Sequence, residues 1–194
     1  MRIGCVKEIK KFEYRVGLIP ANVRAYCTSG HTVYIEKDAG IRSGYTTEEY
    51  EKAGAIILDT AEEVWNSSDL IVKVKEPLEE EYQYFRPSLA IYTYFHLAAN
   101  RKLTEALLAS RTKAIAYETL VEANGTIPLL SPMSQIAGRL SVQEGANCLK
   151  NHCGGSGILL SGVPGTPKGK VVILGGGTVG TNACKMAVGM GADV

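Results

Sequence analysis

The sequence predicts an α/β fold, a doubly wound parallel sheet followed by the beginning of a second α/β domain. Two observations predict it. Short apolar, strand-like segments alternate with helical segments six times between Arg2 and Tyr117, a rhythm typical of parallel sheets with helices on both faces. A further apolar segment at 170–174 then runs directly into a cluster of glycines.

The first domain contains six expected strands, each rich in β-branched, aliphatic or aromatic residues. Pro20 and Gly30 mark the start and end of the first helix, Thr46 or Thr47 caps the second, and Asn100 caps the fifth. The expected strands are 2–7, 32–36, 55–58, 70–74, 89–94 and 114–117, and the expected helices are 20–29, 46–53, 61–66, 78–85 and 100–110. Their alternation favours a flavodoxin-like or Rossmann-like sheet.

A longer helix is expected over 131–153, with Ser131 as its N-cap and Pro132 in its first position. A segment rich in Gly and Pro follows it. We expect the domain boundary there. Residues 1–153, including the connecting helix 131–153, would form one domain, and 154–194 would be a linker and the truncated start of the next.

Gly175, Gly177 and Gly180 fit the pattern G-x-G-x-x-G between the strand-like segment 170–174 and a helical pattern. In Rossmann folds the first glycine permits a sharp turn, the second admits a pyrophosphate and the third allows close packing. The N–H groups at the start of the helix then face the anion. The sequence therefore predicts the start of a dinucleotide-binding Rossmann domain.

The composition excludes several other classes of protein. The net charge of +1 gives no argument for binding to nucleic acid or membrane, and no apolar run reaches the ~18 residues of a transmembrane helix. The N-terminus becomes charged too soon for a signal peptide. Five cysteines without a CxxC motif favour reduced thiols in the cytoplasm. Cys148, His152 and Cys153 match no zinc spacing, so we expect no metal site.

Ligands of doubly wound sheets bind at the carboxyl ends of the strands, where three polar residues are expected. Arg15 could hold a carboxylate through two parallel hydrogen bonds, or equally be a solvated surface arginine. Lys75 could bind an anion, although Lys73 and Lys75 fit the snorkelling lysines of an edge strand equally well. His96 is a candidate acid or base, but the pattern alone favours a hydrogen-bonded core histidine.

Segments along the whole chain resemble the alanine dehydrogenase and pyridine nucleotide transhydrogenase family. The matching segments are 2–4, 6–8, 13–16, 74–77, 93–98, 117–119, 131–138, 154–165 and 175–177. The motif Tyr94-Phe95-His96 favours the dehydrogenase branch, because the transhydrogenase subunit lacks it. The resemblance therefore implies oxidative deamination of L-alanine to pyruvate and ammonia with NAD, and the reverse reaction, in a cytoplasmic homohexamer of L-alanine catabolism.

The resemblance also implies a role for each candidate residue. Arg15 and Lys75 would bind the substrate carboxylate, and His96 would be the catalytic acid and base, which reverses the preference for a core histidine. The residues implied to contact NAD are Ser134, Gly175, Gly177, Thr178, Val179 and Gly180.

Two family features lie beyond Val194: the ribose-binding aspartate, about 20 residues after the glycines, and a second catalytic aspartate. The choice of NAD over NADP is therefore not readable. We expect the 194-residue chain alone to be an incomplete form with little or no activity. The alternatives are a truncated, non-catalytic module that binds metabolites or a partner, and a relative of transhydrogenases or opine-type dehydrogenases.

Overall fold

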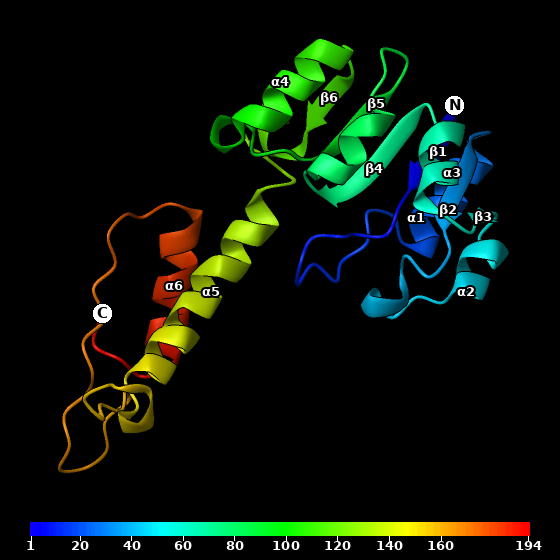
Figure 1. Ribbon diagram of the computed structural model, residues 1–194. Coiled ribbons are helices and arrows are strands. Elements are labelled where there is room, and N and C mark those ends of the chain that lie inside the picture. The colour runs from blue at the N-terminus through cyan, green and yellow to red at the C-terminus, as the bar shows by residue number, and fades with distance from the viewer. The chain divides into compact units, whose positions relative to one another are not determined.

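The computed structural model describes residues 1–194, which form two compact units, Met1–Thr119 and Leu120–Val194 (Figure 1). This division lies earlier than the boundary expected after residue 153. The long helix α5 (Ser131–Cys148) packs within the second unit against the C-terminal helix α6 (Thr178–Gly189). A Cβ atom on Gly138 of α5 would lie only 2.2 Å from the Val179 carbonyl oxygen, so the two helices are in close contact.

The first unit is a six-stranded sheet in the order β3-β2-β1-β4-β5-β6, with every neighbouring pair parallel. This is the strand order of the doubly wound Rossmann sheet, which confirms the predicted fold class. The strands are β1 (Arg2–Cys5), β2 (Thr32–Glu36), β3 (Ile56–Leu58), β4 (Leu70–Lys75), β5 (Ala90–Tyr94) and β6 (Lys113–Ala116). The helices are α1 (Pro20–Thr28), α2 (Thr47–Lys52), α3 (Ala61–Ser67) and α4 (Arg101–Ser110).

The core of this unit lies on both faces of the sheet. Ile71 and Val72, neighbours in β4, belong to different apolar clusters, because successive side chains of a strand point to opposite faces. Val23 and Tyr50 bring α1 and α2 into one cluster, whereas Trp65 brings α3 into the other. Helix α4 joins α3 in that second cluster, so two helices cover each face (Figure 1).

Several expected elements differ in detail. The expected helix 78–85 is a 3-10 helix, η2 (Glu79–Tyr84), the usual form of such short helical segments. Helix α5 ends at Cys148 and a separate turn of 3-10 helix, η5 (Asn151–Cys153), follows it. Leu130, not Ser131, occupies the N-cap of α5, and no side chain caps that end. The prediction of Ser131 as N-cap was therefore wrong.

The segment 170–174 is extended but does not form a strand. A strand requires ladder hydrogen bonds to a neighbour, and here only Lys170 pairs, in a single parallel bridge with Asp193. Val171 and Ile173 pack towards the small core of the second unit, whereas Leu174 is 95% exposed. None of the helices combines the length and apolar character needed to traverse a bilayer.

Candidate functional site

A cavity of about 610 Å³ opens at the carboxyl edge of the sheet in the first unit. The loop after β1 contributes Arg15, β4 contributes Lys73, β5 contributes Tyr94, and the turn η4 (Tyr117–Thr119) contributes Tyr117. Strand ends and loops thus meet where ligands of doubly wound sheets bind.

Arg15 is fixed by a carboxylate at its side. Its Nε donates to Glu13 Oε1 at 2.9 Å, and its Nη2 donates to Glu13 Oε2 at 2.7 Å. The Glu13 side chain is 7% exposed and that of Arg15 is 50% exposed. The bond to Arg15 holds the pKa of Glu13 below its usual value against the effect of burial, and the charge of Lys75 acts in the same direction as Arg15. Arg15 is therefore a half-exposed cation whose guanidinium is oriented by Glu13.

The two lysines of β4 have different surroundings. Lys73 is 1% exposed in a central strand between β1 and β5, so the interpretation as a snorkelling edge lysine was wrong for it. Burial lowers the pKa of Lys73, but the carboxylates of Glu81 and Glu8 outweigh burial and raise it. Lys75 ends the strand, half-buried, and its backbone N–H donates to Glu8 Oε1 at 3.3 Å.

An irregularity in β4 separates these two lysines. Val72 pairs with Tyr92 and Lys75 with Tyr94, so β4 carries one extra residue there. The extra residue interrupts the alternation that would place both lysines on one face. Lys73 lines the cavity beside Arg15, and Lys75 does not.

His96 directly follows β5 and is exposed, which contradicts the interpretation as a core histidine. Its backbone is left-handed, with φ 52° and ψ 40°. That conformation costs a residue other than glycine ~1–2 kcal/mol. The His96 N–H donates to Glu118 Oε1 at 2.7 Å and the Phe95 N–H donates to the same oxygen at 3.1 Å. Hydrogen bonds to a charged acceptor contribute ~1.5–3 kcal/mol each, which is enough to offset the cost.

Sequence reasoning gave no role to Glu118. The available signal was its position, two residues after the sixth strand at the edge where ligands bind. The structure places it within electrostatic reach of the cavity. Burial raises the pKa of the Tyr94 hydroxyl, the charge of Arg15 opposes that rise, and the charge of Glu118 adds to it. Arg15, Tyr94 and Glu118 therefore share one neighbourhood.

The second unit contains a separate hollow of about 610 Å³ between α5, the segment 171–175 and the start of α6. All six residues that we expected to contact NAD line it. They are Ser134, Gly175, Gly177, Thr178, Val179 and Gly180. The structure thus brings Ser134 of α5 together with the glycine turn.

The three glycines have the geometry expected of G-x-G-x-x-G. Gly175 has φ +99°, the sharp turn. A Cβ on Gly180 would lie 1.9 Å from the Gly175 carbonyl oxygen, so only glycine permits this approach of helix and turn. A Cβ on Gly177 would meet no atom within 4 Å, which leaves open space in front of α6. No side chain caps α6, a feature typical of helix N-termini that bind anions.

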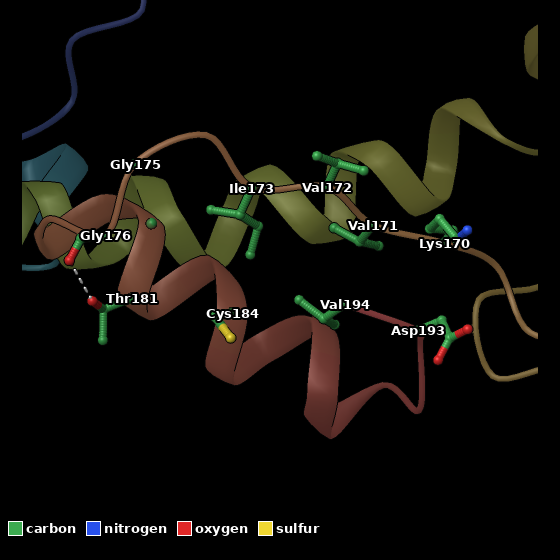
Figure 2. Close-up of a pocket in the computed structure, with 11 residues that line it drawn as sticks. Lys170, Val171, Val172, Ile173, Gly175, Gly176, Thr181, Cys184, Asp193 and Val194 are labelled. Atoms are coloured by element: carbon green, nitrogen blue, oxygen red, sulfur yellow. Dashed lines mark hydrogen bonds between the residues drawn. The ribbon is translucent and has the colours of Figure 1, made fainter.

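A second hollow of about 770 Å³ lies beside the glycine turn and shares part of its lining with the first. Figure 2 shows Ile173, Cys184 and Val194 around it, between the extended segment and α6. The Thr181 hydroxyl donates to the Gly176 carbonyl oxygen at 3.0 Å, which ties the turn to the first turn of α6. All five cysteines are free thiols, and no three His, Cys, Asp or Glu side chains converge as metal ligands would.

The doubly wound sheet with cations at its carboxyl edge, together with the glycine turn and helix, defines a two-part α/β protein of Rossmann type. Residues 4–137 match the family described as alanine dehydrogenase/PNT, N-terminal domain. Residues 141–194 match the corresponding C-terminal domain. The chain belongs to the alanine dehydrogenase and pyridine nucleotide transhydrogenase family.

Curated relatives cover the whole chain. It is 53% identical to an alanine dehydrogenase of Staphylococcus haemolyticus and 54% identical to one of Methanococcus maripaludis, and covers 52% of each. A solved L-alanine dehydrogenase is 55% identical, with a TM-score of 0.92 over 100% of this chain and 54% of its own. A transhydrogenase from Sinorhizobium meliloti shares the fold at 24% identity, with a TM-score of 0.77. The chain spans about half the length of the curated relatives that it matches.

Proposed function

We propose that this chain supplies the substrate site and the pyrophosphate-binding turn of an NAD-dependent alanine dehydrogenase. The observation that carries the proposal is the fork between Arg15 and Glu13 beside the cavity at the carboxyl edge of the sheet. It presents an oriented guanidinium to a small carboxylate, the group that L-alanine and pyruvate share. The relatives named alanine dehydrogenase support this substrate class.

In this proposal Arg15 holds the substrate carboxylate from the wall of the cavity. Lys75 does not line the cavity, but its charge acts on Glu13, and it adds positive charge for the same carboxylate. NAD, when bound, would supply the hydride acceptor for the α-carbon of alanine, whose ammonium group has first lost a proton, and the substrate would become the iminium ion of pyruvate. His96 takes a proton from the water that attacks the iminium carbon and passes it to the nitrogen. His96 then takes the proton of the new hydroxyl group as the C–N bond breaks, so that ammonia and pyruvate leave.

The residues of the second unit fit a dinucleotide. The open space at Gly177 and the uncapped start of α6 suit a pyrophosphate. Thr178 and Val179 would offer backbone N–H groups there, and Ser134 would contact the cofactor from α5. Use of NAD rather than NADP, a cytoplasmic location and assembly into a homohexamer remain part of the proposal.

Isothermal titration of the chain with pyruvate and with NADH tests the proposal. We expect Arg15→Ala to abolish pyruvate binding while Arg24→Ala, on the exposed face of α1, leaves it unchanged. Pyruvate binding that survives in Arg15→Ala would exclude this carboxylate site. Pyruvate binding without NADH binding would favour the alternative of a metabolite-binding module.

Turnover tests the role of His96. In a fusion of this chain with the C-terminal half of the S. haemolyticus relative, His96→Ala should cut NADH formation from L-alanine by about 10²–10⁴-fold. The matched control is His31→Ala, a half-buried histidine in the turn that precedes β2, outside the cavity. Near-normal turnover in His96→Ala would exclude acid–base catalysis by this residue.

A further inference from the structure

We propose that Glu118 is the positioning residue of His96: its carboxylate holds the histidine in the left-handed turn that presents the imidazole at the carboxyl edge of the sheet. The inference deepens the proposed function and rests on the role given there to His96. It goes beyond that function because Glu118 acts through the backbone and not on the substrate.

Hydrogen bonds from two consecutive backbone N–H groups converge on the Glu118 carboxylate. The N–H of His96 lies 2.7 Å from Glu118 Oε1, and the N–H of Phe95 lies 3.1 Å from Oε1 and 3.3 Å from Oε2. Two consecutive backbone donors aimed at one anion form the kind of concave site that binds anions elsewhere. Here the anion is part of the chain, so the turn keeps its shape before any ligand arrives.

The left-handed turn at His96 needs this support. His96 is one of four residues other than glycine with positive φ in the chain. Left-handed residues of this kind persist where the surroundings over-determine them, and they cluster at functional sites. Phe95, directly before His96, is fully buried and anchors one side of the turn. On the other side the Ala99 N–H donates to the His96 carbonyl oxygen at 3.0 Å.

Glu118 itself is held in place by the residues on both sides of it. The ring of Tyr117, its neighbour, packs edge-on against Tyr92 at 4.2 Å and against Tyr94 at 4.7 Å between ring centroids. Thr119, on the other side, donates its hydroxyl to the Ala116 carbonyl oxygen at 3.2 Å. The turn η4 is thus tied to the sheet on both sides of Glu118, so the position of the carboxylate is set by β5 and β6.

The experiment uses NMR on the isotopically labelled 194-residue chain, which has only three histidines. The variants are Glu118→Ala, which removes the acceptor, and Glu118→Gln, which keeps a neutral acceptor. The matched control is Glu105→Ala, an exposed carboxylate on α4. The probe is pyruvate, and the readouts are amide exchange at residues 95 and 96, the His96 ring resonance and the Arg15 Nε–H resonance.

We expect Glu118→Ala to speed amide exchange at Phe95 and His96 by about tenfold or more, and Glu118→Gln to do so by less. Glu105→Ala should leave both rates unchanged. Pyruvate should shift the His96 ring in the wild type. In Glu118→Ala the Arg15 resonance should still respond while the His96 ring does not, a loss of positioning without a loss of binding. A merely structural role would remove both responses together.

The outcomes separate the two proposals. If pyruvate does not shift His96 in the wild type, the function proposed for His96 is overturned, whatever the exchange rates show. If His96 responds equally in the wild type and in Glu118→Ala, or if the exchange rates do not change, the positioning role is overturned. If Glu118→Ala does not fold, the test is made with Glu118→Gln. Unchanged amide exchange together with an unchanged His96 response in that variant would overturn the positioning role.

Discussion

The Nζ atom of Lys73 lies 2.7 Å from Oε1 of Glu81, and both side chains are withdrawn from solvent. Glu8 Oε2 is the second partner, at 3.5 Å. The remaining carboxylate oxygens are also used: Glu81 Oε2 accepts from the Leu78 N–H at 2.9 Å and Glu8 Oε1 from the Val74 N–H at 2.6 Å. A buried ionic group is tolerated under this condition, when the geometry is good and the other lone pairs are satisfied.

Replacing Lys73 by methionine should destabilise the chain strongly. The apolar volume is kept, but two carboxylates remain buried without their cation. Removing one partner of such a group costs ~3–5 kcal/mol. Urea unfolding of Lys73→Met at pH 7 measures the loss of unfolding free energy. A loss below about 1 kcal/mol would contradict the structure at this site.

Lys102→Met is the matched control for that substitution. Lys102 contacts Glu79 at 2.8 Å, nearly the same distance, but the two side chains are 75% and 68% exposed. An exposed pair contributes ~0–1 kcal/mol, so this variant should unfold like the wild type. Combining Lys73→Met with Glu8→Gln and Glu81→Gln should recover part of the loss, because the uncompensated charges are then gone.

The buried Lys73 shows where sequence reasoning about the fold stops. Local signals sufficed for the helix ends: Thr46 accepts the Glu49 N–H and Asn100 accepts the Leu103 N–H, as predicted for N-caps. A cap is formed by residues three positions apart, so a local pattern can contain it. Lys73 is neutralised by carboxylates from two other elements. No pattern within β4 could reveal that partnership.

The sequence likewise predicted the local features of the candidate site but not the contacts between distant residues. The position of His96 after a strand follows from the alternation of elements, and the turn geometry of Gly175 and Gly180 follows from their spacing. The left-handed backbone of His96 does not follow from a local pattern. It depends on Glu118, which lies in the turn after the neighbouring strand β6. The segment 170–174 fails as a strand for a related reason, since its apolar pattern is local but ladder bonds need a neighbour.

Exchanging Arg15 for lysine should weaken pyruvate binding although the charge is kept. Lysine cannot form the two parallel bonds that orient the guanidinium on Glu13. One lost charge-assisted hydrogen bond corresponds to a fall in affinity of about tenfold or more. Isothermal titration measures it, with Arg24→Lys as the control of equal chemistry on an exposed helix face. Equal affinity in Arg15→Lys would show that charge alone suffices.

The ion pair of Arg2 and Asp69 should contribute to the free energy of unfolding at neutral pH, and this contribution should be lost in acid. Hydrogen bonds from Arg2 lower the pKa of Asp69 to about 2. The folded pKa is below the unfolded value of about 3.9, so the contribution is present above pH ~4 and is lost as the pH falls towards 2. Asp69→Asn should therefore differ from the wild type in urea midpoint at pH 6 and converge with it near pH 2.

Solvent screening limits the size of that effect. The Arg2 and Asp69 side chains are 53% and 41% exposed, so 1 M salt should shrink the difference at pH 6. Asp59→Asn is the control, because Asp59 is 81% exposed and lies 3.7 Å from Lys37. If the difference between Asp69→Asn and the wild type persists unchanged at pH 2, the pair is not its origin.

Three Gly→Ala substitutions test the proposed cofactor site at Gly177, with Gly180 as a structural glycine and Gly189 as a control. Gly180→Ala would place a Cβ 1.9 Å from the Gly175 carbonyl oxygen, so it should lower both stability and NADH affinity. Gly177→Ala meets no atom within 4 Å and has φ −72°, which alanine adopts freely. The substitution should lower the free energy of unfolding by less than ~1 kcal/mol, because alanine is a weaker N-cap than glycine. Its methyl group would nevertheless occupy the space proposed for the pyrophosphate.

Gly177→Ala should therefore lower NADH affinity about tenfold or more at nearly unchanged stability. Gly189→Ala, at the far end of α6, also meets no atom within 4 Å. This variant should bind NADH like the wild type. Its free energy of unfolding should rise by up to ~1 kcal/mol, because alanine loses less backbone entropy than glycine when it folds into a helix. Fluorescence titration with NADH and thermal unfolding measure the two effects. Wild-type affinity in Gly177→Ala would mean that the pyrophosphate does not lie against this turn.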